Sequence, residues 1–276
     1  MSRYRTPDFA RGVLLSLLLA ACAPAFQLKN FPKSEDLFRA SLREFQRGKW
    51  ENAVTGFERL TNDLPARDAL LPRAYFYLGS ARQKNGEHLL AAQTFTRLAE
   101  TFPDDSLGDD ALFQAGKSYE AMWKKPVLDA TYGESAQGVF RTLVSAYPQS
   151  PLADKATAEL NRLDDWFARK DYETSLHYLR RKAYDSAILY LKDVIREHPN
   201  APQTRLAYLR LLESYRLINY KEESTELCQT MRGAYPVDRE VLAACGPGTA
   251  QVAPVPALSV PALPVPALPA SAKPTP

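Results

Sequence analysis

The chain has 276 residues, with 35 Lys and Arg against 32 Asp and Glu, and a formal net charge of +3. Hydrophobic residues make up 45%, which excludes a chain disordered throughout, and the small net charge argues against a general nucleic-acid binder. Three cysteines are too few for a disulfide framework, and the three histidines form no metal-ligand pair. The usual phosphate-binding and nucleophile-elbow motifs are absent, so the sequence favours a protein that is not an enzyme and needs no cofactor.

The first 21 residues have the pattern of an export signal. A basic start precedes an apolar run at residues 13–21, which is shorter than the roughly 20 residues that a membrane-spanning helix needs. The run ends in Leu-Ala-Ala-Cys, which resembles the lipobox of bacterial lipoproteins. We therefore expect a signal peptide over residues 1–21, lipid attachment at Cys22 and an otherwise soluble chain. Ala23, the residue after the cysteine, favours the outer membrane over retention in the inner membrane.

Five segments in the middle of the chain align without gaps at their closing prolines. A small residue stands twelve positions before each proline, an apolar residue follows four later, and another stands three beyond that. This spacing is one face of an α-helix, and the proline ends it. The three positions in the five segments are Ala53, Phe57 and Leu60; Ala91, Phe95 and Leu98; Ala136, Phe140 and Leu143; Ala187, Leu191 and Val194; and Ser224, Cys228 and Met231.

A second amphipathic stretch precedes these segments. Before the second segment, Gly79 stands twelve residues ahead of Ala91, and we expect the glycine to let the two helices approach closely with Ala91 facing it. Paired helices with this pattern resemble the tetratricopeptide repeat. The sequence therefore predicts an all-α superhelix of about five helix pairs over residues 34–236, preceded by an N-terminal tether at residues 22–33.

Two irregularities interrupt the repeat. In the third unit Gly116 and Ala136 are twenty residues apart instead of twelve, which places an eight-residue insertion around residues 124–129. The third and fourth closing prolines are 51 residues apart, and a polar stretch from near Pro151 to near Arg181 fills that gap. We interpret it as one long helix that serves two consecutive units.

The last part of the chain differs in composition. Residues 247–276 hold nine Pro and seven Ala, and Val-Pro-Ala-Leu occurs three times, so residues 237–276 are predicted to be a disordered or extended tail. A spacer role is favoured over a docking strip, because Lys273 is the only charged residue among the prolines and the repeated Val-Pro-Ala-Leu motifs have no basic anchor. Cys228 and Cys245 remain after lipidation. A disulfide is possible in an oxidising compartment, but Cys228 holds an apolar repeat position, which favours a buried thiol.

Stacked helix pairs curve, and the first helix of each unit then lines a concave groove. Such a surface takes an extended peptide or a helix. Tyr75 and Tyr119 are expected to pack between units. The candidate groove residues are Tyr77, Arg82, Gln114 and Lys117.

Three stretches resemble the BamD family, the outer-membrane lipoproteins of the β-barrel assembly machinery, over residues 23–236. They are Gly48-Lys49-Trp50-x2-Ala53, the stretch from Tyr147 to Ala156, and Phe167 to Glu173 running on into Tyr178-x2-Arg181. The resemblance implies a lipid-anchored scaffold on the periplasmic face of the outer membrane that helps to insert and fold outer-membrane proteins. Its implied partners are a BamA-like barrel protein and unfolded outer-membrane proteins.

The resemblance also implies that Tyr178 and Arg181 face the BamA-like partner. A solvated arginine and a packed tyrosine are equally compatible with the sequence at these positions. Two other classes of protein stay open. One is a different periplasmic repeat lipoprotein, acting as an adaptor in cell-envelope division or polysaccharide export. The other is an accessory protein of a peptidoglycan hydrolase, for which the sequence offers no catalytic residues.

Overall fold

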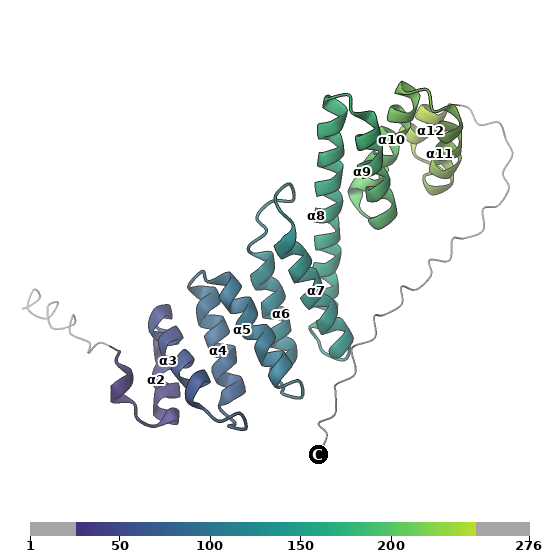
Figure 1. The fold of residues 1–276 in the computed structure, drawn as a ribbon. Coiled ribbons are helices and arrows are strands. Elements are labelled where there is room, and N and C mark those ends of the chain that lie inside the picture. Colours follow the sequence, from purple (N-terminus) through teal and green to yellow (C-terminus); the bar gives the residue numbers. More distant parts are fainter. Residues whose placement is uncertain (1–25, 247–276) are drawn as a thin grey trace, which may run out of the picture. The chain divides into compact units, whose positions relative to one another are not determined.

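A computed structural model describes residues 26–246, and every regular element in this range is a helix (Figure 1). The predicted signal peptide, Cys22 and residues 247–276 lie outside the described residues. The helices are η1 (Leu28–Asn30), α2 (Ser34–Gln46), α3 (Trp50–Asp63), α4 (Leu71–Lys84), α5 (His88–Thr101), α6 (Gly108–Glu120), α7 (Thr131–Ala146), α8 (Ala153–Arg180), α9 (Tyr184–Glu197), α10 (Pro202–Leu217), α11 (Lys221–Ala234) and α12 (Arg239–Cys245).

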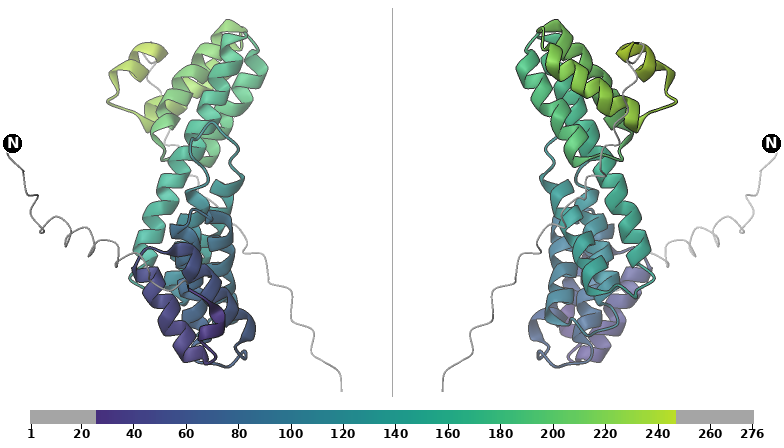
Figure 2. Two further views of the ribbon diagram at one scale, coloured as in Figure 1. Left: turned by 90° about the vertical axis from the view of Figure 1, so that its left-hand side faces the viewer. Right: turned by 90° about the vertical axis from the view of Figure 1, so that its right-hand side faces the viewer.

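From α2 to α10, consecutive helices pack side by side, each running opposite to the one before (Figures 1 and 2). Every helix from α2 to α9 contacts the next one along the chain, as the predicted series of helix pairs requires. The 28-residue helix α8 contacts α7, α9 and α10, so one helix does serve two consecutive units. The chain divides into two compact units at Leu227 and Cys228, inside α11.

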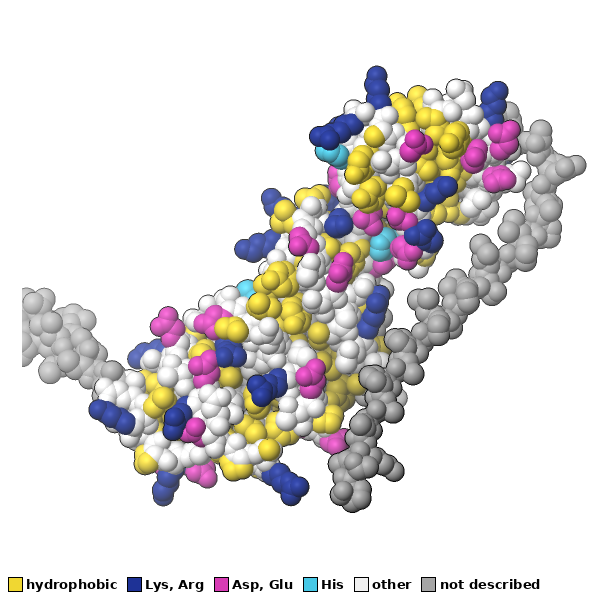
Figure 3. Space-filling model, in the orientation of Figure 1, with side chains coloured by type: hydrophobic (Ala, Val, Ile, Leu, Met, Phe, Trp, Pro, Cys, Tyr) yellow, Lys and Arg dark blue, Asp and Glu magenta, His cyan; other side chains and the backbone are white. Residues whose placement is uncertain are grey.

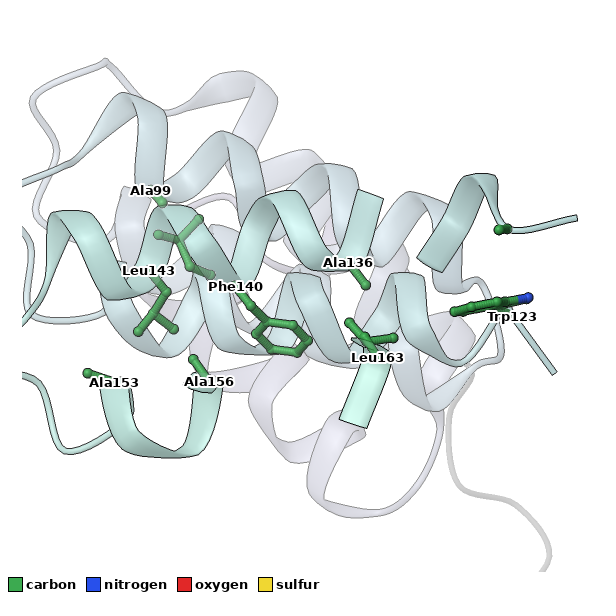
Figure 4. Packing of buried hydrophobic residues seen from close by; sticks show 10 residues of the cluster. Ala99, Trp123, Ala136, Phe140, Leu143, Ala153, Ala156 and Leu163 are labelled. Atoms are coloured by element: carbon green, nitrogen blue, oxygen red, sulfur yellow. The ribbon is translucent and has the colours of Figure 1, made fainter. Parts of the chain in front are cut away.

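The core confirms the repeat positions read from the sequence. In the first four units all three anchor residues are at most 1% exposed, and in the fifth Cys228 and Met231 are also buried. Figure 4 shows how Ala136, Phe140 and Leu143 of α7 lie beside Ala153, Ala156 and Leu163 of α8 in one cluster. The fold is therefore all-α, with the helix pairing of a tetratricopeptide array.

Close approach within a pair depends on glycine, and an aromatic ring of the second helix lies nearest to it. A Cβ atom on Gly79 would lie 2.8 Å from the ring of Phe95, and one on Gly116 would lie 2.5 Å from the ring of Phe140. The large ring four residues after the small anchor is thus the group nearest to each of these glycines.

Serine takes the glycine's place in two other units. Ser41 and Ser175 also stand twelve residues before the small anchor, and both are fully buried. The hydroxyl of Ser41 donates to the carbonyl of Leu37 at 2.8 Å, and that of Ser175 donates to the carbonyl of Tyr172 at 2.6 Å. Because each hydroxyl is satisfied by its own helix, it can be buried without an unpaired polar group.

Four of the five links within pairs share one turn. A residue with positive φ ends each first helix: Gly48, Gly86, Lys182 and Asn219. The next amide donates to the carbonyl five residues earlier, at 2.8–3.1 Å. This is the usual left-handed ending of a helix, which glycine adopts without strain. The third link has no such residue among the described ones and runs over residues 121–130, the range that contains the expected insertion at residues 124–129.

The N-terminal segment begins to pack earlier than expected. The rings of Phe26 and Phe31 stack at 5.6 Å, and both pack with Leu28 against the core formed by α2, α3 and α4. Residues 26–31 are therefore part of the folded unit, and the predicted tether at residues 22–33 must be corrected to this extent. Aromatic side chains that cover the open side of the first helix pair account for the difference.

The second compact unit, which begins at Cys228, also differs from the sequence expectation. Cys228 and Cys245 form a disulfide, although a buried thiol was favoured, and α12 lies within the segment assigned to the tail. The Asp238 carboxylate accepts hydrogen bonds from the amides of Glu240 and Val241, which caps the start of α12. Val241 is fully buried. The tail assignment therefore does not hold for residues 239–245, since a cap, an apolar contact and a disulfide stabilise this helix.

The glycine contacts predict a pair of opposite stability effects. We expect Gly116→Ala to destabilise the fold by about 1–3 kcal/mol, because its Cβ overlaps the Phe140 ring. Gly138, on the neighbouring helix α7, has nothing within 4 Å of an added Cβ. Gly138→Ala should therefore stabilise the fold by about 0.5–1 kcal/mol. Thermal unfolding followed by circular dichroism measures both, and equal effects of the two substitutions would contradict the packing argument.

Candidate protein-binding surfaces

Tyr77, the first predicted groove residue, lies among aromatic rings. Its ring stacks on Phe57 at 5.6 Å and meets the edges of Phe38 at 5.9 Å and Phe45 at 5.7 Å. These rings come from α2 and α3, so Tyr77 of α4 packs the second helix pair against the first. Its half-buried position leaves only part of the side chain for a ligand.

Arg82 connects three helices. Its Nη1 donates to the hydroxyl of Thr94 on α5 at 2.5 Å, and its Nη2 forms an ion pair with Glu58 on α3. The Arg82 side chain is only 17% exposed. The guanidinium is thus engaged inside the array, where its charge-assisted hydrogen bonds hold α4 between its neighbours.

Lys117 belongs to a network of four charges between α6 and α8. Its Nζ lies 2.7 Å from Glu120 and 2.9 Å from Glu159. Arg162 pairs with the same two carboxylates and also lies over the ring of Trp166 at 5.8 Å. Two cations and two anions alternate, so the network is neutral and joins the third unit to α8.

Gln114 is half-buried on α6, and its backbone carbonyl accepts the hydroxyl of Ser118 at 2.7 Å. Of the four predicted groove residues, Tyr77, Arg82 and Lys117 make internal contacts that the sequence did not indicate. In the structure, Tyr77, Arg82 and Lys117 therefore pack against or bridge neighbouring helices. Their contact with a peptide stays a prediction.

The other predicted pair lies at the turn between α8 and α9. The ring of Tyr178 stacks on that of Tyr190 of α9 at 5.5 Å, with 14° between the planes. Arg181 follows the last residue of α8 and is exposed, as are Arg180 and Lys182 on either side of it. None of these three cations forms an ion pair with another described residue. The turn therefore presents a small basic surface beside a tyrosine pair.

Burial changes the acid–base properties of this region. It is the main cause that raises the pKa of Asp171 on α8; the neighbouring Lys170 and His198 lower that pKa, and Asp193 raises it. Burial is also the first cause of the raised pKa of Tyr190, followed by its neighbours Tyr178 and Asp171. The carboxylate of Asp171 is thus held in a poorly solvated position close to the tyrosine pair.

The sequence did not single out the exposed apolar side chains of α9 and α10. Leu189 is 58% exposed, and Leu206 and Leu217 are also exposed. Figure 3 shows hydrophobic side chains gathered on this face over α9 and α10. Repeat anchors identify the buried face of a helix. Leucines that lie outside the anchor positions were the sequence signal for these exposed apolar side chains.

Residues 26–246 contain neither a metal-binding cluster nor a membrane-spanning helix. This range holds no group of three or more His, Cys, Asp or Glu side chains arranged to bind a metal ion. Its helices are also too short or too polar to cross a bilayer.

Comparison with known proteins identifies the family of the helix array. The family model YfiO, described as an outer membrane lipoprotein, matches residues 32–229. The chain belongs to this family. The match begins just before α2 and ends within α11, so it covers the helix pairs and leaves out the proline-rich end.

Curated relatives of this YfiO-family chain carry the name outer membrane protein assembly factor BamD. The one from Caulobacter vibrioides is 24% identical over 233 residues, which is 83% of this chain and 76% of the relative. The one from Vibrio cholerae is 24% identical over 79% of this chain and 94% of its own length. The Neisseria gonorrhoeae relative is also 24% identical, over 81% and 90% of the two chains.

Solved structures that match the YfiO-family chain are more distant. The TPR domain of P58(IPK) has a TM-score of 0.42 and 13% identity, and it covers 87% of this chain and 59% of its own. The TPR2AB domain of yeast Sti1 has a TM-score of 0.39 and 11% identity over 77% and 81% of the two chains. The fold assignment therefore rests on the helix packing and on the family, not on these scores.

Asp171 predicts how stability depends on pH. Its pKa is higher in the folded chain than the ordinary value of 3.8. The folded state therefore favours the protonated carboxyl, and this group's stabilising contribution is lost as pH rises through the folded pKa. We expect Asp171→Asn to raise the unfolding temperature by a few degrees at pH 7, and by progressively less as pH falls toward 4. A gain that is equal at every pH would contradict this origin.

Proposed function

We propose that the chain is a lipid-anchored scaffold on the periplasmic face of the outer membrane, where it helps to insert and fold outer-membrane proteins. Its partners are a BamA-like barrel protein and the unfolded outer-membrane proteins themselves, and no step of catalysis is assigned to it. The observation that carries this proposal is the family match over residues 32–229, together with relatives named as assembly factors over most of their lengths. The helix array supports it, because repeat arrays bind proteins along extended surfaces.

Attachment through Cys22 would hold the first helix pair close to the bilayer. Phe26 already packs against the core of α2, α3 and α4, so only residues 23–25 separate the lipidated cysteine from the folded unit. An extended chain spans at most about 3.6 Å per residue, which limits the distance from Cys22 to Phe26 to about 14 Å. The anchor thus places the first unit at the membrane surface.

Within this proposal, the α8–α9 turn receives the BamA-like partner. Arg181 is exposed and makes no ion pair with another described residue, and its planar guanidinium suits bidentate pairing with a carboxylate of the partner. The exposed Leu189 and Leu206 supply apolar area nearby in the sequence, on the two helices that follow. Unfolded substrates are assigned to the first three units, where the candidates are Tyr77, Arg82, Gln114 and Lys117.

The turn predicts a specific loss of affinity. Arg181→Glu should weaken binding of the chain to the periplasmic domains of the cognate BamA-like protein by about tenfold or more, because an attractive charge becomes a repulsive one. Isothermal titration calorimetry at moderate salt measures the change. Arg141→Glu is the matched control, since Arg141 on α7 is also exposed and carries the same charge change.

Two negative results of this experiment would contradict different statements. If the unaltered chain does not bind the BamA-like domains, the proposed function is wrong. If it binds and Arg181→Glu has no more effect than Arg141→Glu, the function stands and the position of the contact is wrong.

A further inference from the structure

The link between α6 and α7 differs from the other four. Where they turn within a few residues through a left-handed residue, this link runs over residues 121–130. Both of its ends are fixed in the core. Trp123 is 2% exposed and packs against Trp166 at 5.3 Å and Phe167 at 4.8 Å, both on α8, while Ala130 at the other end is also buried. Figure 4 shows Trp123 at one end of the cluster that contains Phe140 and Leu163.

The fixed ends leave little freedom to the residues between them. Trp123 also lies against α7, where a Cβ on Gly133 would overlap the indole ring. The amide of Leu128 donates to the carbonyl of Lys125 at 3.1 Å, which closes a four-residue turn with Pro126 at its second position. Proline presets the backbone there. The loop thus has a defined conformation, and its tip is the turn at residues 125–128.

Asp129, the residue after the turn, hydrogen-bonds to the first residue of α7. The carboxylate of Asp129 accepts the amide of Thr131 at 2.9 Å and its hydroxyl at 2.7 Å, and these hydrogen bonds lower the pKa of Asp129. Asp129 therefore holds the first residue of α7 and stays charged, and its oxygen is engaged by Thr131 and not by a lysine of the loop.

The tip presents two apolar side chains next to two cations. Val127 is 59% exposed and Leu128 is 51% exposed, and they are adjacent. Lys124 and Lys125 are exposed, and neither makes an ion pair with a described residue. Single exposed apolar residues are common on protein surfaces. Here, however, an extra loop, buried anchors and a proline turn together hold two of them outward beside unpaired lysines.

We propose that residues 124–128 form a docking knob for a protein partner whose surface has an apolar pocket with an acidic rim. Val127 and Leu128 would enter the pocket, and Lys124 and Lys125 would pair with the rim. Because the loop is already held in shape, little conformational entropy would be lost on binding. The knob is small, so it is one contact of a larger or transient interface. This inference does not depend on the function proposed above.

A protein fits this tip better than a lipid surface. Loops that enter a bilayer interface commonly present Trp or Tyr there. In this loop the aromatic residue, Trp123, points inward and is buried. Two lysines contribute only about 1 kcal/mol each near an anionic membrane.

Site-specific photo-crosslinking in cells of the native host tests the proposal. A photoreactive phenylalanine analogue is placed at Val127 or Leu128 of the full chain, and at Leu90 on α5 as a control position that is 44% exposed. We expect the two loop positions to give one protein adduct that Leu90 does not give, with the crosslinked peptide mapping to an acidic, apolar surface. Adducts with lipid only, no adduct, or the same adducts at all three positions would overturn the proposal.

A second set of variants tests the charges separately. Lys124→Glu together with Lys125→Glu should reduce the yield of that adduct by about fivefold or more, as charge reversal at a pocket rim disfavours encounter. The matched control is Arg141→Glu, combined with Arg39→Glu so that the charge change is equal. All four side chains are exposed, so the helical circular dichroism spectrum should stay unchanged. Equal yields for the loop and control variants would contradict the acidic rim.

Discussion

The array depends on how closely the two helices of a pair approach each other. A ring of the second helix lies against a residue of the first helix that has no side chain, as with Phe95 on Gly79 and Phe140 on Gly116. Where the first helix carries Ser41 or Ser175, the hydroxyl bonds to its own helix and the place stays small. This approach buries the anchor residues completely, and each helix then packs against the next along the chain.

The repeat anchors made the fold predictable. A small residue followed by apolar residues four and seven positions later identifies a helix face that must be buried. Fourteen of the fifteen anchor residues are buried, and Ser224 in the last unit is half-buried. The same twelve-residue offset that indicated Gly79 also leads to Ser41 and Ser175, so the sequence held the signal for them. The long helix α8 followed from the wide proline spacing, with ends within two residues of those expected.

The side-chain contacts were less predictable. Periodicity indicates which face is buried, but not which neighbouring helix supplies a partner. Glu58 and Glu159 are 24 and 42 residues away from Arg82 and Lys117, so these ion pairs depend on how α3 and α8 pack. The disulfide was missed for a related reason, since Cys228 is both a buried repeat residue and a neighbour of Cys245 once α12 forms. The packed segment at Phe26 was missed because it lacks a repeat pattern.

The central proposal is that this chain helps to assemble β-barrel proteins in the outer membrane. It is tested most directly by depleting the chain in its native host and measuring folded outer-membrane barrels by their heat-dependent mobility on gels. The account predicts that folded barrels decline, that unfolded forms accumulate, and that the unaltered gene restores both. Unchanged barrel levels, together with a defect in division or in polysaccharide export, would contradict the account.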